Sequence, residues 1–344
     1  MGIDISTKEQ AKLKNQKIPW VTLAKCIGLY LMVLGHMELV SPGMSAYIYT
    51  FHMPLFFILS GMFTSRNTDK KTVCEKLYRR LIIPFIIIAA IWCVIYIVLW
   101  VKNGMFDFGY WLNNIIGTFV SPGKSMGVLK TLRGPLWFLL ALAEIKFLAC
   151  FIEKTWFWII LSVLAIAISL LLGHFNIVLP FAIDSAVLAI PFYAAGVFLR
   201  QYSSIWETNK LMSLIAAIVC GLLTFAVYKY NGIVDINHCL WGNNILLFYI
   251  GGALGSIGIF FLSISASSIY NYMGGVILTL VSGAMLIIGF SQNISSFIRS
   301  LLPFLAGSNI GGMLIGLITL AVLYPLIIVA RKYFPAILGY RKSS

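Results

Sequence analysis

Charged residues are scarce in this sequence of 344 residues. They make up 10% of the chain, against about a quarter in soluble domains, while hydrophobic residues make up 60%. This composition excludes an ordinary soluble globule, because so much apolar surface cannot all be buried in one core. A mean hydropathy of +0.94 indicates that lipid surrounds much of the chain.

Acidic residues are the scarcer of the two charge classes. The sequence has 11 of them against 25 Lys and Arg, which gives a net charge of +14. On a soluble protein this excess would suggest nucleic-acid binding. On an apolar chain it is better interpreted as basic loops on the cytoplasmic side of a membrane, so we expect no nucleic-acid partner.

Paired cysteines and phosphate-binding loops are also lacking. The six cysteines stand singly, with no C-x-x-C pair and no histidine spacing suited to zinc, so they predict neither a disulfide scaffold nor a metal site. The glycine pairs Gly251/Gly255 and Gly312/Gly316 are not followed by a P-loop lysine. Their spacing indicates close packing between membrane helices.

Long hydrophobic runs are what the sequence has in abundance. A spanning helix needs about 20 mainly apolar residues. The runs predict an all-α, polytopic membrane protein with one integral-membrane domain over 1–344: a tail (1–17), a transmembrane bundle (18–331) and a second tail (332–344). The ten expected helices are approximately 18–40, 47–63, 81–101, 135–152, 156–173, 184–200, 211–228, 243–264, 272–290 and 308–331.

The distribution of basic residues predicts the orientation of this bundle. Lys8, Lys12, Lys14 and Lys17 precede the first run, so the amino end should be cytoplasmic. With ten helices, 17 basic residues fall on the cytoplasmic side and 6 on the outer side. Both termini are therefore expected inside, and the long outer segment 102–134 is expected to be a lid or part of an acceptor site.

The first run contains three ionisable residues, Lys25, His36 and Glu38. Each costs several kcal/mol in lipid unless it faces a cavity or a partner. Lys25 and His36 are 11 residues apart, about three helical turns, so they share one stripe and lie about 16 Å apart along the axis. They either line one cavity or snorkel separately to the two interfaces.

Other runs carry a few more polar residues. His52 lies near the outer end of the second run, where it could take part directly in the chemistry or only pack and form hydrogen bonds. Trp137 and Glu144 share a face of the fourth run as substrate or structural residues, and Lys25 is the expected ion-pair partner of Glu144. Asp184 and Arg200 occupy ordinary interfacial positions.

The densest basic segment precedes the third run and contains Lys70, Lys71, Lys76, Arg79 and Arg80. It could be a topogenic anchor beside anionic lipid. It could also bind a cytosolic ligand with several phosphates, because Arg79 and Arg80 lie just before the membrane entry at Pro84.

Four of these segments together resemble the acyltransferase-3 family of bacterial membrane proteins. The first is Trp20–His36, which has a basic residue eleven positions before a glycine-preceded histidine. The others are Phe51-His-Met-Pro-Leu-Phe-Phe-Ile-Leu-Ser-Gly61, Arg79-Arg-Leu-Ile-Ile-Pro84 and Pro135-Leu-Trp-Phe-Leu139. They cover the first 140 residues in the family's order, while later helices match in number and hydropathy.

The resemblance implies a ten-helix bacterial enzyme of the cytoplasmic membrane. Such an enzyme transfers an acyl group, usually acetyl, from acyl-CoA to a hydroxyl of a cell-envelope glycan or lipid-linked sugar. It implies that His36 is catalytic and that Lys25 stands where many members have Arg. Thr22, Cys26 and Ser291 depart from the Asp, Gly and His common in relatives.

Residues and resemblance combine into one hypothesis. Lys76, Arg79 and Arg80 bind the phosphates of acyl-CoA, and its pantetheine arm runs beside Lys25. His36 acts as general base on the acceptor hydroxyl, oriented by His52 in preference to Glu38; a covalent acyl-histidine is the alternative.

A second hypothesis is a transporter or flippase for a glycan precursor, in which the polar stripe forms the permeation path. The acyl group could be acetyl or succinyl. The sequence does not predict which glycan is the acceptor or how the chains associate.

Overall fold

A computed structural model describes residues 18–36, 39–64, 69–130, 135–200 and 209–340. Glu38, the tail 1–17 and the last four residues lie outside this described part. Within it the chain is all-α, and the two isolated β-bridges form no strand. The all-α prediction is therefore confirmed.

The described part of the first half of the chain forms eight helical elements. They are α2 Pro19–Gly35, α3 Pro42–Tyr49, α4 His52–Met62, α5 Lys70–Leu77, the π-helical turn η1 Tyr78–Ile82, α6 Ile83–Lys102, α7 Phe108–Val120 and α8 Trp137–Ala149.

The described part of the second half forms seven α-helices and three short 3-10 turns. They are α9 Phe157–His174, η2 Pro180–Ala182, α10 Ile183–Leu199, α11 Lys210–Asn231, α12 Ile245–Ser265, α13 Ile269–Ser282, α14 Ala284–Leu301, η4 Pro303–Leu305, α15 Asn309–Tyr333 and η5 Pro335–Leu338.

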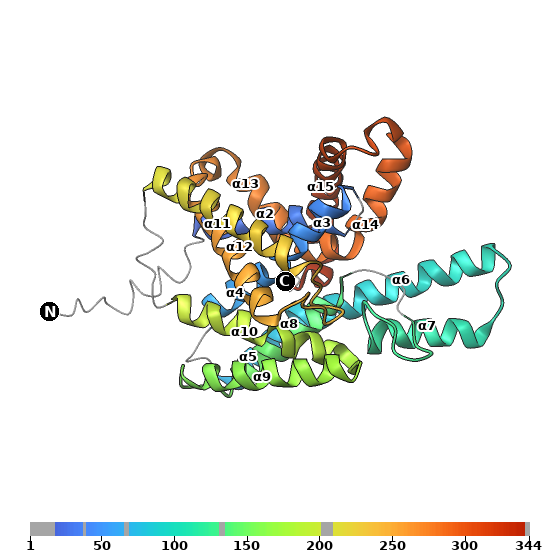
Figure 1. The fold of residues 1–344 in the computed structure, drawn as a ribbon. Coiled ribbons are helices and arrows are strands. Elements are labelled where there is room, and N and C mark those ends of the chain that lie inside the picture. Colours follow the sequence, from blue (N-terminus) through green and yellow to red (C-terminus); the bar gives the residue numbers. More distant parts are fainter. Residues whose placement is uncertain (1–17, 37–38, 65–68, 131–134, 201–208, 341–344) are drawn as a thin grey trace.

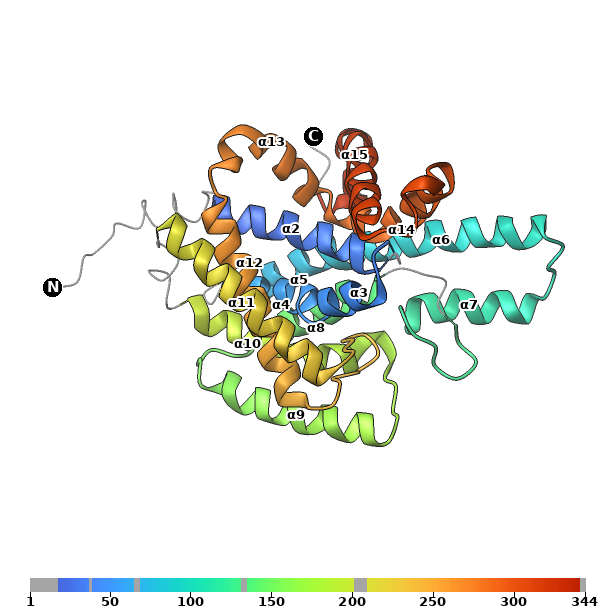
Figure 2. The same cartoon turned by 45° about the horizontal axis from the view of Figure 1, so that its top comes forward.

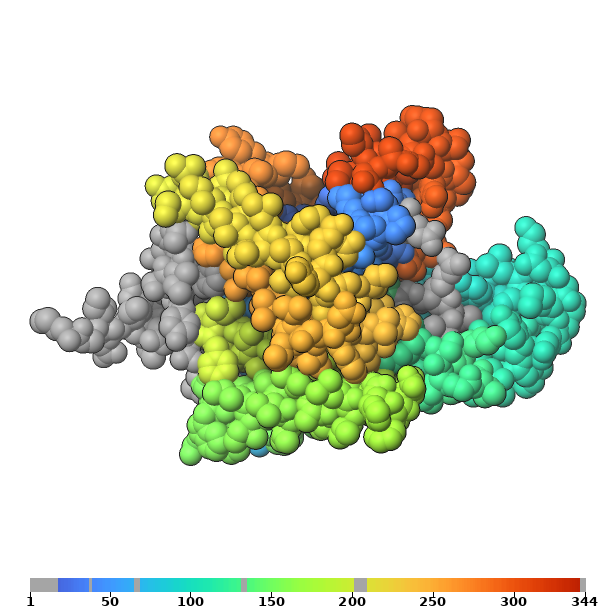
Figure 3. All heavy atoms as spheres, viewed as in Figure 1, coloured from blue at the N-terminus to red at the C-terminus, as the bar shows by residue number. Residues whose placement is uncertain are grey.

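The short helices α4 and α8 lie in the interior of the bundle, together with the longer α10. Nine of the residues of α4 are buried, and all of α8 up to Ala143 is buried. In α9 and α11 only 17% and 11% of the apolar stretch is buried. Figures 1 and 2 show α9 and α11 on the outside of the bundle, and in Figure 3 they cover much of one face. Their exposed apolar side chains are suited to lipid.

Fewer helices than ten have the length and composition of a membrane span. Six qualify in the described part, or seven if α13 and α14 form one span bent by 82°. The count of ten was wrong by this criterion because α2, α4 and α8 have only 17, 11 and 13 residues. Short helices are tolerated at membrane depth when protein surrounds them, as it does α4 and α8.

Two glycines allow α4 and α10 to touch. A Cβ on Gly61 would lie 2.0 Å from the carbonyl oxygen of Tyr193, and one on Gly196 would lie 2.0 Å from that of Ile58. Only glycine permits this backbone contact. The crossing fixes α4, and with it His52, against the largest buried helix.

The segment 102–134 is not an extended loop. It begins with α7, which returns beside α6, so that the two form the helical hairpin that projects from the bundle in Figures 1 and 2. Trp100 of α6 stacks on Trp111 of α7 with ring centroids 5.9 Å apart. The chain then enters the turn that contains Lys124, whose side chain is buried.

Candidate active site

Two histidines and a tyrosine meet where α2 ends and α4 begins. His36 is the C-cap of α2, Tyr49 is the last residue of α3, and His52 is the first residue of α4. The backbone breaks between α3 and α4 at Phe51, whose φ and ψ are −138° and −15°. This break places Tyr49 and His52 side by side, with ring centroids 4.9 Å apart.

His36 contacts both of these residues. Its Nδ1 lies 2.6 Å from the hydroxyl oxygen of Tyr49, within hydrogen-bonding distance. Its ring meets that of His52 edge-on, with centroids 5.3 Å apart. The side chain of Gln292, from the distant helix α14, donates to the backbone carbonyl of His36 at 3.4 Å. Residues from four helices, α2, α3, α4 and α14, therefore meet at His36.

The remaining ring nitrogens are free to act. The Nδ1 of His52 donates to the carbonyl oxygen of Ile48 at 3.0 Å, so the Nε2 of a neutral His52 carries a lone pair. The Nε2 atoms of His36 and His52 are both buried, and neither has a partner in the described part of the chain. Two unpartnered imidazole nitrogens side by side are suited to proton transfer.

Tyr49 holds Nδ1 of His36, and His52 contacts the edge of its ring, so an orienting role for His52 stays a prediction. Sequence reasoning missed Tyr49. The available signal was its position three residues before His52, which is one helical turn had the helix been continuous.

An ion pair between a carboxylate, Asp235, and an imidazole, His238, lies in the loop between α11 and α12. Asp235 accepts a hydrogen bond from Nδ1 of His238 at 2.8 Å and interacts electrostatically with His36. Burial, the largest single effect, would raise the pKa of Asp235. The hydrogen bond and charge of His238, the charge of His36 and the backbone bond from Asn237 together outweigh burial, so the pKa lies below its usual value. The bond between His238 and Asp235 also raises the pKa of His238.

A cavity of about 410 Å³ runs below the histidines. Met32, four residues before His36, and Met53, the neighbour of His52, line it. Lys25 and Arg80 also line it, whereas Lys76 and Arg79 of the basic segment do not. His36, which was expected to share a cavity with Lys25, is not among the described lining residues. Lys146 of α8 is the third cation in its wall.

The predicted ion pair between Glu144 and Lys25 is wrong. The ion pairs of the described part are Lys124–Asp184 and His238–Asp235, and the Oε2 of Glu144 is buried without a partner. Glu144 is two residues from Lys146, about 200° around α8, so it points away when Lys146 faces the cavity. Trp137, on the face of Glu144, is buried.

Asp184 is not an ordinary interfacial residue. Its side chain is 1% exposed, and its Oδ2 lies 2.5 Å from the ammonium of Lys124, which also donates to the carbonyl of Asn237 at 2.8 Å. Asn237 in turn donates to the carbonyl of Gly123 at 2.9 Å. This network ties the loop that carries Asp235 to α10 and to the turn after α7.

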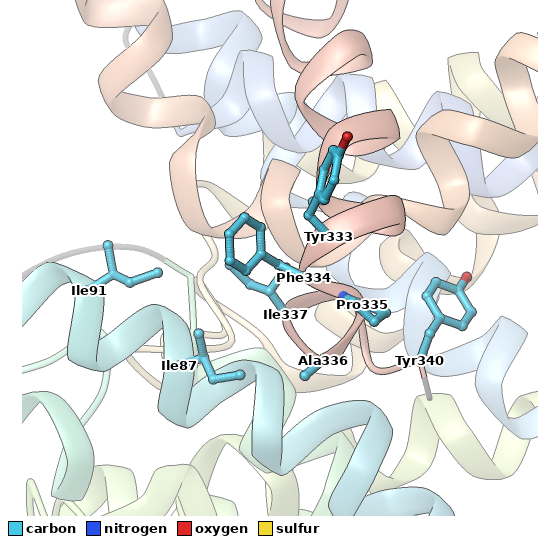
Figure 4. A pocket seen from close by; sticks show the side chains of 9 residues that line it. Ile87, Ile91, Tyr333, Phe334, Pro335, Ala336, Ile337 and Tyr340 are labelled. Carbon is cyan, nitrogen blue, oxygen red and sulfur yellow. The ribbon is translucent and has the colours of Figure 1, made fainter. Parts of the chain in front are cut away.

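A second cavity, of about 550 Å³, is apolar. It lies between α6 and the end of the chain, where Ile87 and Ile91 face the segment Tyr333–Ile337 (Figure 4). Its lining has no histidine, carboxylate or ammonium group, so it offers no acid or base for catalysis.

A buried imidazole above a basic cavity, in a bundle of apolar helices, has the features of a multi-pass membrane acyltransferase. Residues 18–331 match the acyltransferase-3 family, described as an acyltransferase domain, and the chain belongs to that family. No curated protein and no solved structure matches the chain. In the described residues, no group of three or more His, Cys, Asp or Glu side chains could hold a metal ion.

Proposed function

We propose that this protein transfers an acyl group, acetyl rather than succinyl on family grounds, from cytosolic acyl-CoA to a hydroxyl of a cell-envelope glycan or lipid-linked sugar. The observation that carries the proposal is His36: its Nε2 is buried with no partner among the described residues, and its Nδ1 is held by Tyr49. The basic cavity is lined by Met32, one helical turn before His36. Family membership supplies the reaction class.

In the proposed orientation, both termini and Arg80 face the cytoplasm of a bacterium, and His36 lies toward the outer side of the cytoplasmic membrane. The donor enters past Arg80, with its pantetheine arm beside Lys25, and its thioester reaches the level of Met32 and Met53. The polar acceptor approaches His36 from the side of the loop that carries Asp235. The two substrates then meet at one imidazole.

The proposed chemistry is direct transfer. The acceptor hydroxyl gives its proton to Nε2 of His36 as its oxygen bonds to the thioester carbonyl carbon. The carbon–sulfur bond then breaks, and the CoA thiolate leaves with the proton from the imidazolium. Nε2 must start unprotonated, which requires Nδ1–H to donate to Tyr49. A general base of this kind contributes about 10²–10⁴-fold to the rate.

His52 serves as a second polar contact in this scheme. Its Nε2 accepts a hydrogen bond from the acceptor or from the protonated His36. Lys76 and Arg79 act only at the surface, where they attract the anionic donor toward Arg80. Trp137 and Glu144 support the walls of the site.

The experiment is an assay of purified protein in detergent with acetyl-CoA and glycan acceptors. Release of free CoA that depends on an acceptor supports acyl transfer. CoA release with no dependence on any acceptor, or none at all, contradicts it. Mass spectra of envelope glycans from a deletion strain and its parent identify which polymer loses the acyl group.

A transporter or flippase for a glycan precursor is the second candidate. The bend of 82° between α13 and α14 favours it, because broken helices are common at transporter binding sites. Movement of a glycan precursor across vesicles without consumption of CoA would support transport over acyl transfer.

A further inference from the structure

Three cations from three separate helices share the wall of the cavity below His36. Lys25 comes from α2, Arg80 from the π-helical turn η1, and Lys146 from α8. The other described residues of the lining are apolar apart from Ser60, and none of them is a carboxylate. Lys25 and Lys146 are half-buried, whereas Arg80 is exposed, so Arg80 marks the mouth.

None of the three has a carboxylate partner in the described part of the chain, where the acids in ion pairs are Asp184 and Asp235. The contacts that they do make are weak. The Lys25 ammonium lies 5.8 Å from the ring centre of Phe63, and that of Lys146 lies 5.9 Å from the ring of Tyr193. Such contacts are weaker than a charge-assisted hydrogen bond to an anion.

Like charges that face one another in a membrane protein are expensive unless something neutralises them. A single bound polyanion can neutralise all three cations at once. A cavity of about 410 Å³ has the size of a small-molecule pocket. Arginine and lysine are the side chains that bind phosphate oxygens, the first as a fork and the second as a point charge.

We propose that Lys146, together with Lys25 and Arg80, binds the diphosphate group of a ligand inside this cavity. Of the basic segment, Arg80 lines this cavity, whereas Lys76 and Arg79 lie outside it. The inference rests on the proposed function only for the source of the diphosphate, which is CoA if the donor is acyl-CoA. A prenyl-diphosphate sugar carrier has the same chemistry.

The π-helical turn supports this assignment independently. Turns of this kind are rare and are often found at functional sites. In η1, the backbone of Arg80 packs against Gly339, whose φ is +73° and whose Cβ, if present, would lie 2.8 Å from the Arg80 Cα. The end of the chain therefore holds Arg80 at the mouth of the cavity.

The test measures, by calorimetry, the binding of CoA to purified protein in nanodiscs of zwitterionic lipid. Lys146→Gln should weaken CoA binding about tenfold, and Lys146→Arg should retain most of the affinity, as expected for a charge-assisted contact. The matched control is Lys154→Gln, because Lys154 is exposed and does not line the cavity. It should change the affinity less than twofold. Thermal unfolding of each variant checks that it is folded.

Two further probes separate this proposal from the proposed function. Inorganic pyrophosphate should compete with CoA in the parent protein and compete poorly in Lys146→Gln. If a prenyl diphosphate binds in a Lys146-dependent manner and CoA does not bind, the diphosphate site stands and the acyl-CoA donor is wrong. If folded Lys146→Gln binds CoA, prenyl diphosphate and pyrophosphate as the parent does, or if none of them binds the parent, the diphosphate site is wrong.

Discussion

Nδ1 of His36 lies 2.6 Å from the hydroxyl oxygen of Tyr49, although the two residues belong to different helices. This contact determines which nitrogen of His36 remains available. A tyrosine hydroxyl that accepts from Nδ1–H leaves Nε2 with its lone pair, which is the form that a general base requires.

Tyr49→Phe should lower kcat for acyl transfer about tenfold and leave KM for the donor unchanged. The variant removes one orienting hydrogen bond, worth about 1–1.5 kcal/mol, without touching the cavity. Steady-state kinetics with acetyl-CoA measures both constants. Tyr47→Phe is the control, because the Tyr47 hydroxyl donates to the carbonyl of Gly221 instead. An equal effect of the two variants would contradict the orienting role.

Lys124→Met should destabilise the protein by about 3–5 kcal/mol, because it leaves the Asp184 carboxylate buried without its partner. The double variant Lys124→Met with Asp184→Leu should cost less than the two single variants added together. Unfolding in detergent measures these differences. Lys102→Met, at an exposed position, should have little effect. Strict additivity would show that the pair is not coupled.

Gly61→Ala and Gly196→Ala should each destabilise the crossing of α4 and α10 by about 1–3 kcal/mol, because the added methyl group meets a backbone carbonyl 2.0 Å away. Gly275→Ala is the matched control in α13, where the new Cβ has nothing within 4 Å. It should stabilise its helix by about 0.5–1 kcal/mol. Thermal unfolding midpoints test the contrast, and equal midpoints would contradict it.

The pair Asp235–His238 should make stability depend on pH. Because the pKa of His238 is raised in the folded protein, its contribution is complete below the ordinary histidine pKa and is lost as the pH rises through the raised value. The Asp235 contribution is lost only in acid, since its pKa is lowered. The thermal unfolding midpoint should therefore decrease as the pH is raised from about 6 to about 8. His238→Gln should flatten this fall, and His174→Gln should not.

Much of the fold could be predicted from hydropathy. The apolar runs correspond to helices, and Gly312 and Gly316 do pack closely, against Leu39 and Leu34. The number of spans could not be predicted, because hydropathy is the same for a helix that faces lipid and for one surrounded by protein. Thus α4 and α8 were counted as spans, although they are short and buried.

The site was predictable only in part where one helix determines it. Lys25 and His36 were expected to line one cavity, because helical periodicity is reliable over eleven residues. The lining contains Lys25 and Met32, one turn before His36, but His36 is not among its described residues. Contacts between helices were not predictable. Tyr49 depends on a backbone break, and its one signal was its spacing from His52. Lys146 and the pair Lys124–Asp184 depend on a helix rotation and a loop inserted from a distance, which have no local sequence signal.

The central claim is that His36 carries the chemistry, and His36→Ala tests it most directly. The measurement is transfer of labelled acetyl from acetyl-CoA to the glycan in membrane vesicles that contain equal amounts of each protein, with exposed His174→Ala as control. We predict a loss of at least about 100-fold for His36→Ala and near-normal transfer for the control. Near-normal transfer by His36→Ala would contradict the account.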